Sequence, residues 1–191
     1  MKYIQIQLWK IEDNAYTYTF SFLLNLDSNS IAITNDGSYL SAGFSDNTVS
    51  IWNGKTGELF RQITGHDGNI NSIDFSPDGQ YLATGSSDNT AIIWETETGK
   101  IFRHLKGHHD EINSVDFSPD GQYLATGSSD NTAIIWEINA GEVFHHLKDH
   151  RHNVTSVDFR YQGQDKHLAT GSWDMTTIIW DVSIGQPLGK K

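Results

Sequence analysis

The sequence predicts an all-β fold: a β-propeller of four-stranded antiparallel blades, with about four blades in the chain. Two observations indicate this fold. Residues 75–95 recur without a single change as residues 117–137. Tryptophans also close five short apolar stretches at steps of about 43 residues, and these are Trp9, Trp52, Trp94, Trp136 and Trp180. Sequence periods of roughly 20–50 residues are typical of solenoids, propellers and arrays.

Within one period the pattern is that of four short strands. Residues 70–75 alternate in polarity, residues 76–79 (Ser-Pro-Asp-Gly) have the composition of a tight turn, and residues 81–86 form a second strand. Residues 90–94 and 100–105 give the third and fourth strands. Four-stranded units of this kind bury both faces only when they stack on one another, which is the arrangement of a propeller.

The strand count predicts incomplete ends. Residues 4–9 and 15–22 read as a third and a fourth strand, and three complete units follow at about 28–63, 70–105 and 112–147. Only three strands are expected between residues 154 and 181, because Pro187 in the tail cannot donate to a ladder. We therefore expect the last blade to lack its outer strand, and residues 15–22 are the candidate to replace it.

The same count defines the domain organisation. We expect one domain over residues 1–191, with a partial unit at 1–22 and repeats at about 23–63, 64–105, 106–147 and 148–191.

Composition narrows the functional classes. The chain has 191 residues, of which 37% are hydrophobic, and it carries a formal net charge of −11. This much apolar and aromatic matter argues against long-range disorder. The negative charge opposes attraction to phosphate backbones and anionic lipids, so nucleic acids and membranes are poor candidate partners. With no cysteine, disulfides, thiolate metal sites and a catalytic thiol are excluded.

The beginning of the sequence does not resemble a secretion signal. Residues 3–9 alternate between polar and apolar types, whereas a signal peptide needs an uninterrupted apolar run. No later stretch approaches the roughly 20 apolar residues of a membrane span. We therefore expect a cytoplasmic protein.

Several short motifs strengthen the propeller interpretation. The dipeptide Gly65-His66 is followed by residues 75–79 (Phe-Ser-Pro-Asp-Gly), 82–88 (Leu-Ala-Thr-Gly-Ser-Ser-Asp) and 92–94 (Ile-Ile-Trp). This series resembles the WD40 repeat, and it returns from residue 107 to residue 136. The resemblance is clear in the copies that end at Trp94, Trp136 and Trp180, weaker in the copy that ends at Trp52, and limited to one strand at Trp9. Only the last clear copy has the literal Trp-Asp dipeptide.

The resemblance implies a hydrogen-bonded chain from Asp to His to Thr to Trp inside each blade. These structural tetrads are Asp88, His66, Thr84 and Trp94; Asp130, His108, Thr126 and Trp136; and Asp174, His150, Thr170 and Trp180. Such a chain gives a buried indole N–H an acceptor and fixes the imidazole tautomer. In the copy that ends at Trp52, Leu24 and Ala42 replace the His and the Thr, so that blade is predicted to be the softest.

Catalysis and metal binding are both disfavoured. Asp, His and Thr recur together and could suggest a nucleophile relay, but a catalytic site is normally unique and this set is copied three times. The adjacent pair His145 and His146 lies in a strand, where neighbouring side chains face opposite ways and cannot share an ion. We expect no catalytic residue, no metal and no cofactor.

The resemblance also implies a partner surface on the narrow face, around the central opening. This face is lined by the start of the first strand of each blade and by the residue that precedes the turn Asp. The corresponding residues are Asn69, Asn71 and Ser87; Glu111, Asn113 and Ser129; and Asn153, Thr155 and Trp173. Trp173 stands where the other copies have serine. A tryptophan there is either an anchor for a partner or packed against a neighbouring blade.

These features predict a non-enzymatic scaffold that binds a protein or peptide partner. The alternatives are a propeller that binds small ligands such as sugars between its blades, and a truncated or split product of a larger WD40 protein. Four blades would leave open blade faces, since the family usually has about seven or eight. We therefore expect a homodimer in which two half-rings form one eight-bladed propeller and exchange their outer strands.

Overall fold

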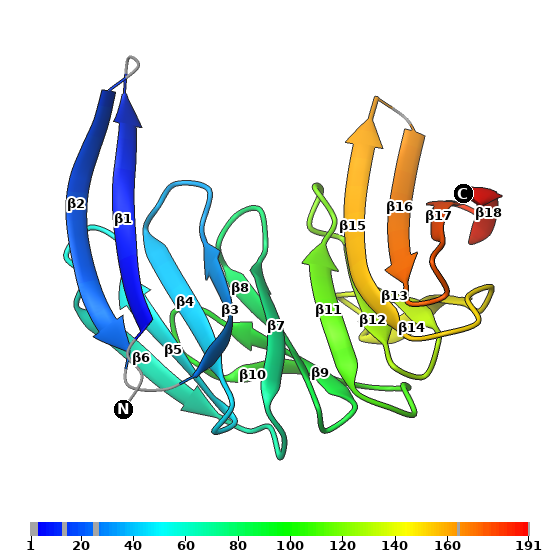
Figure 1. Cartoon of the computed structure of the whole chain (residues 1–191), viewed down its shortest axis with the longest axis horizontal. Coiled ribbons are helices and arrows are strands. Elements are labelled where there is room, and N and C mark those ends of the chain that lie inside the picture. The colour runs from blue at the N-terminus through cyan, green and yellow to red at the C-terminus, as the bar shows by residue number, and fades with distance from the viewer. Residues whose placement is uncertain (1–3, 13–14, 25–26, 164, 191) are drawn as a thin grey trace.

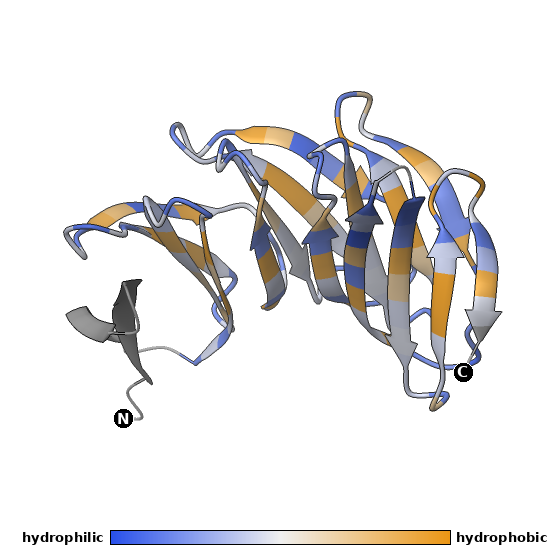
Figure 2. Cartoon of the chain, turned by 90° about the horizontal axis from the view of Figure 1, so that it is seen from above, coloured by the Kyte–Doolittle hydropathy of each residue, from blue (hydrophilic) through white to orange (hydrophobic). Residues whose placement is uncertain are grey.

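The computed structural model describes residues 4–12, 15–24, 27–163 and 165–190, with side-chain surroundings from residue 27 onward. It contains four four-stranded antiparallel sheets and one two-stranded sheet, and the described residues form no helix. The all-β, four-bladed prediction is confirmed. The four blades follow one another in an open arc that does not close into a ring (Figures 1 and 2).

The strands appear in simple meander order. A hairpin of β1 (Ile4–Glu12) and β2 (Ala15–Leu24) precedes the blades. Blade one consists of β3 (Ser28–Ile33), β4 (Tyr39–Phe44), β5 (Thr48–Asn53) and β6 (Leu59–Thr64). Blade two consists of β7 (Ile70–Phe75), β8 (Tyr81–Ser86), β9 (Thr90–Glu95) and β10 (Ile101–Lys106).

The remaining two blades repeat this order. Blade three consists of β11 (Ile112–Phe117), β12 (Tyr123–Ser128), β13 (Ala133–Glu137) and β14 (Glu142–Leu147). Blade four consists of β15 (Val154–Gln162), β16 (Asp165–Ser172), β17 (Thr177–Asp181) and β18 (Gln186–Lys190). In blades one, two and three the first strand lies against the first strand of the next blade.

The prediction that the last blade lacks its outer strand is wrong. Strand β18 pairs with β17, with Gln186 opposite Asp181 and Pro187 opposite Trp180. The proline lies on an edge strand and beside a register shift, the two places where a missing N–H does least harm to a ladder. Residues 15–22, assigned to that place, instead belong to β2 and pair with β1. Strand exchange into blade four is therefore not needed.

The turn after the first strand shows why these short strands end where they do. Gly79 has a φ of 70°, which a glycine adopts without steric cost. The hydroxyl of Ser76 donates to Asp78 and accepts from the N–H of Tyr81, so side chains close the turn. The hairpin between β7 and β8 is thereby fixed by its local sequence.

The hydrophobic core lies between the blades. One buried cluster joins Ala83 and Ile93 of blade two to Val115 and Phe117 of blade three. The backbones approach closely here: a Cβ added to Gly85 would lie 2.6 Å from Cγ2 of Ile112. Each blade therefore depends on its neighbour to bury its faces, and the repeat is stable only as part of a stack.

Hydrogen bonds cross the same interfaces between inner strands. The carboxylate of Asp74 accepts from the N–H of Phe117 at 2.8 Å, and that of Asp116 accepts from the N–H of Phe159 at 2.5 Å. Burial raises the pKa of Asp74 to about 6 and that of Asp116 to about 7, although the N–H donors act in the opposite direction. Burial thus makes the neutral form of both carboxyls easier to populate than it is in water.

This burial predicts a pH-dependent weakness. Because the folded-state pKa of Asp74 lies above its ordinary value of 3.8, its stabilising contribution is complete below that value and is lost as the pH rises through about 6. Asp74→Asn keeps an acceptor without a charge, and we expect it to raise the free energy of unfolding at neutral pH by about 1–3 kcal/mol. Urea unfolding between pH 4 and 8 measures this.

Asp116→Asn should behave in the same way, and Asp67→Asn, at an exposed residue of the β6–β7 loop, is the control. A gain that is the same at pH 4 and pH 8 would contradict the assignment to a buried charge.

Candidate binding face and its supporting network

A continuous hydrogen-bonded chain runs through blade two. The Nδ1 of His66 lies 2.8 Å from Oδ2 of Asp88, and its Nε2 lies 2.7 Å from Oγ1 of Thr84. The same Thr84 hydroxyl accepts from the indole N–H of Trp94 at 3.0 Å. His66, Thr84 and Trp94 are all buried. The structure thus brings together the four residues of the first tetrad.

The protonation states of His66 and Asp88 follow from their surroundings. Burial lowers the pKa of His66, which outweighs the opposite effect of Asp88 and keeps the imidazole neutral. Burial alone would raise the pKa of Asp88, but hydrogen bonds from Thr90, the N–H of Asp67 and His66 lower it instead. A neutral imidazole with Nδ1–H donates to the carboxylate and accepts from the hydroxyl of Thr84. Every buried polar side-chain atom of these four residues therefore has a partner.

The same geometry recurs in the next two blades. His108 lies 2.9 Å from Asp130 and 2.7 Å from Thr126, and Trp136 donates to that threonine at 2.9 Å. In blade four the corresponding residues are His150, Asp174, Thr170 and Trp180, with distances of 3.0, 2.7 and 2.9 Å. Hydrogen bonds lower the pKa of Asp130 and Asp174 although burial opposes this.

Each chain fastens a connection between blades to the body of the following blade. His66 lies in the loop from β6 to β7, whereas Asp88 lies in the turn from β8 to β9. The N–H of Asp67 also donates to Asp88, at 2.9 Å. Two neighbouring loops are therefore held at fixed positions by a buried network, which makes the surface they form rigid.

Blade one has different residues at the positions of the tetrad. Ala42 occupies the place of Thr84 and offers no hydroxyl, and Asp46 accepts from the N–H and the hydroxyl of Thr48 within its own turn. The side chain of Leu24 lies outside the described residues. We call the contact of the loop histidine with the Asp and the Thr of the tetrad the histidine clamp. By its sequence, blade one lacks this clamp.

We predict that blade one opens more readily than blade two. Amides of β4 and β5 should exchange with deuterium faster than those of β8 and β9 under native conditions, because fewer buried contacts hold their loops. Hydrogen-exchange mass spectrometry compares the two sets of peptides directly. Equal protection would refute a stabilising role for the clamp.

Thr84 bonds both His66 and Trp94, so its substitution tests the hydrogen-bonded network directly. Thr84→Val keeps the volume but leaves the indole N–H of Trp94 and the Nε2 of His66 without a partner. We expect a loss of about 1–3 kcal/mol in the free energy of unfolding. Thr126→Val in the identical segment is the matched replicate, and Thr98→Val on the exposed turn is the control; urea titration measures all three.

The predicted narrow-face residues of blades two and three are largely engaged within the fold. The side-chain amide of Asn71 donates to the hydroxyl of Ser87 and to the carbonyl of Ile112 in the next blade, at 3.1 and 3.0 Å. Asn113 makes the equivalent bonds to Ser129 and Val154. These asparagines link neighbouring blades, a role that the sequence did not reveal.

The other predicted residues of this face also hold loops together. The carbonyls of Asn69, Glu111 and Asn153 accept from the N–H groups that follow the second strands. The amide of Asn153 donates to Ser129 of the preceding blade at 3.2 Å, and the hydroxyl of Thr155 donates to the carbonyl of Gly171 at 3.3 Å.

Trp173 stands apart from these residues. Its side chain is 65% exposed and lies 5.6 Å, centroid to centroid, from the ring of His152 in the same blade. It is therefore not packed into the interface with the preceding blade. Met175, two residues later, is 96% exposed and has a φ of 65°.

Met175 was missed by the sequence analysis. Asn47, Asn89 and Asn131 occupy the equivalent positions with φ near 70°, a conformation that asparagine tolerates and methionine does not favour. The signal was present in the repeat itself, because blade four alone replaces that asparagine. The turn between β16 and β17 thus presents two large apolar side chains where the other turns present polar ones.

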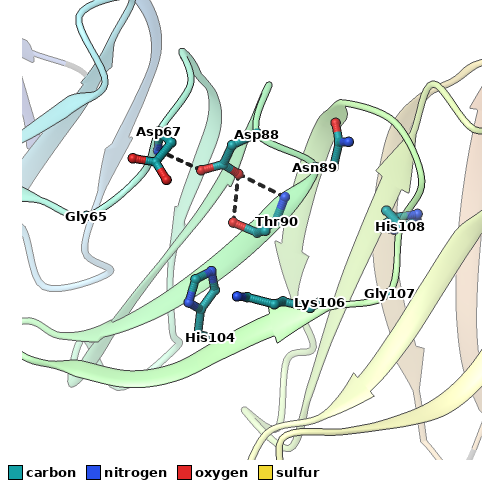
Figure 3. Close-up of a pocket in the computed structure, with 9 residues that line it drawn as sticks. All are labelled: Gly65, Asp67, Asp88, Asn89, Thr90, His104, Lys106, Gly107 and His108. Carbon is teal, nitrogen blue, oxygen red and sulfur yellow. Dashed lines mark hydrogen bonds between the residues drawn. The ribbon is translucent and has the colours of Figure 1, made fainter.

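A hollow of about 350 Å³ lies on blade two, beside the loops that enter and leave this blade. It is lined by polar residues and glycines, which are Gly65, Asp67, Asp88, Asn89, Thr90, His104, Lys106, Gly107 and His108. Figure 3 shows Asp88 held between Asp67 and Thr90, with His104 and Lys106 contributed by β10. Small-molecule sites are usually lined by apolar and aromatic side chains, which this hollow lacks.

The histidines do not assemble into a metal centre among the described residues, where no group of three or more His, Asp or Glu could hold an ion. His146 instead lies 3.2 Å from the hydroxyl of Thr132, and His145 contacts the ring of Phe144.

Comparison with protein families matches the family model described as "WD domain, G-beta repeat" at residues 26–53, 57–95, 99–137 and 141–181. The chain belongs to the WD40-repeat family. Its WD40 repeats are out of phase with its blades, because residues 57–95 combine β6 of blade one with β7, β8 and β9 of blade two. The three repeats at residues 57–95, 99–137 and 141–181 therefore each carry a loop histidine and bridge two blades, whereas the match at residues 26–53 contains no histidine and lies within blade one. WD40 repeats form protein-interaction scaffolds.

Among curated protein sequences, none matches this WD40 chain. Within the residues that the structure describes, no helix is long and apolar enough to cross a membrane.

Proposed function

We propose that this WD40 chain is a non-enzymatic scaffold that binds a protein or peptide on the narrow face of blade four. The observation that carries the proposal is the pair of exposed side chains, Trp173 and Met175, in the β16–β17 turn. The remaining narrow-face residues form the polar rim of the proposed binding surface.

Physical chemistry supports a binding role for this turn. Tryptophan is enriched among the residues that dominate binding energy, and methionine adapts to irregular apolar partners. A methionine at positive φ, in the place of an asparagine, carries a backbone cost. Its side chain is 96% exposed, so packing within the blade compensates little of this cost. Strained residues of this kind concentrate at functional sites.

The alternatives have less support. A sugar or other small ligand would be expected to use apolar or aromatic walls, and the hollow on blade two is lined by polar, charged and small residues. An enzyme would need a unique reactive group, whereas the Asp, His and Thr of the tetrads recur with nearly identical distances in three blades. Both remain outcomes of the test below.

The assembly is part of the proposal. One domain of four blades supports a homodimer that completes an eight-bladed ring, since residues at the two ends of the arc are more exposed than their equivalents between blades. A truncated or split protein with its missing blades on another polypeptide is the rival arrangement. A cytoplasmic location and the absence of nucleic-acid and membrane partners complete the proposed setting.

Peptide selection tests the binding face and does not require the partner to be identified. A displayed library of random peptides is panned on the full chain and counter-selected on Trp173→Ser/Met175→Asn, which restores the residues of blades two and three. We expect selected peptides to lose about 30-fold in affinity on this variant, the size of one binding hot spot. Titration calorimetry measures the loss.

Leu59→Gln, which removes an exposed leucine from β6 in blade one, is the control and should leave the affinity unchanged. Peptides that bind both the wild type and the double variant equally, or a failure to select any peptide, would refute this face as the binding site.

A further inference from the structure

The two ends of the arc expose faces that are buried everywhere else in the chain. On β3, Ile31 and Ile33 are 56% and 49% exposed. The equivalent residues on β7, β11 and β15 are at most 7% exposed, because the preceding blade covers them; they are Ile73, Phe75, Val115, Phe117, Val157 and Phe159. We call the surface around Ile31 and Ile33 the first end face.

Blade four exposes the complementary surface. Ile179 on β17 is 37% exposed, whereas the equivalent Ile51, Ile93 and Ile135 are fully buried against the following blade. Thr177 stands where Ala91 and Ala133 are buried. We call the surface around Thr177 and Ile179 the last end face.

The internal interfaces show how these two kinds of face fit together. Across each of the three interfaces, a serine hydroxyl on the first strand of one blade accepts from an N–H on the first strand of the next blade, at 3.0 to 3.2 Å. We call these first strands, β3, β7, β11 and β15, the inner strands. The serines are Ser30, Ser72 and Ser114, and the N–H groups belong to Ile73, Val115 and Val157. In the second and third interfaces an aspartate accepts a further N–H in the same way.

The end faces carry both halves of this pattern. On β15, Ser156 and Asp158 occupy the places of Ser114 and Asp116, and both are exposed. On β3, the N–H groups of Ile31 and Ile33 occupy the places of those of Val157 and Phe159. A second copy of the chain would therefore supply matching apolar side chains and matching hydrogen bonds at once.

We propose that the first end face of one chain packs on the last end face of a second copy, and that this happens twice about a two-fold axis. Each seam joins β3 to β15 of the partner chain, with Ser156 and Asp158 accepting from the N–H groups of Ile31 and Ile33. Twice four blades closes an eight-bladed ring without exchanging strands. This inference specifies the homodimer named under the proposed function and is independent of the peptide-binding turn.

Each seam joins a first end face to a last end face, so variants that alter only one kind of face can be tested alone and as a mixture. Wild-type chain should have about twice the 21.4 kDa mass by light scattering after size exclusion. Ile31→Glu and Ile179→Glu each place a charge in both seams and should weaken the dimer by about 100-fold or more. Both residues are exposed within one chain, so circular dichroism should show an unchanged fold.

A mixture of the two variants should recover a heterodimer, because one of its two seams then joins two unaltered faces. Leu59→Glu on β6 is the matched control and should remain dimeric. A monomeric wild type, an open oligomer larger than a dimer, or a mixture that stays monomeric would overturn the proposal. Peptide binding by the monomeric variants would still be measurable, so the two proposals can fail separately.

Cross-linking tests the register of the seam. The chain has no cysteine, so Ile31→Cys/Ser156→Cys introduces the only pair, and it should give a covalent dimer under mild oxidation. Ser30→Cys/Ile73→Cys places the same pair at an internal interface, where Ser30 Oγ lies 3.1 Å from the N–H nitrogen of Ile73. That control should cross-link within one chain. Internal cross-linking without any intermolecular cross-link would overturn the proposed register.

Discussion

The structure depends on one constraint: the hydrophobic core lies between blades, so no blade can bury its faces alone. Ala83 and Ile93 of blade two meet Val115 and Phe117 of blade three, and glycines such as Gly85 permit the close approach. A single four-stranded meander with two apolar faces would be unstable in water. Stacking along the arc buries the internal faces, whereas apolar residues of the two outermost faces, such as Ile31 and Ile179, remain partly exposed.

The buried hydrogen-bond chains convert this stack into a surface of defined shape. Because His66 comes from the loop that enters blade two and Asp88 from a turn within that blade, their contact fixes two loops relative to one another. The imidazole stays neutral and the carboxylate stays charged, so the contact is a satisfied network within the fold. The same network recurs with nearly identical distances in three blades.

Function in a repeat protein is best sought where the repeat is broken. Blades two and three share an identical segment and present the same small polar residues at their turns. Blade four departs from them with Trp173 and Met175, which are both highly exposed. The end faces are a second departure, because residues such as Ile31 keep the apolar character of their buried equivalents while they lie in solvent. These two departures suggest a partner surface and a subunit interface respectively.

The sequence by itself determined the blade architecture, because periodic strands and turn residues are local signals. The members of the hydrogen-bonded networks followed from its resemblance to the WD40 repeat. It could not determine the outer strand of blade four, since the effect of Pro187 depends on whether its N–H is needed, and that depends on the edge position and register shift of β18. Nor could it show that Asn71 links two blades or that Trp173 is exposed. Those properties depend on which surfaces meet across the stack, and only the tertiary arrangement decides that.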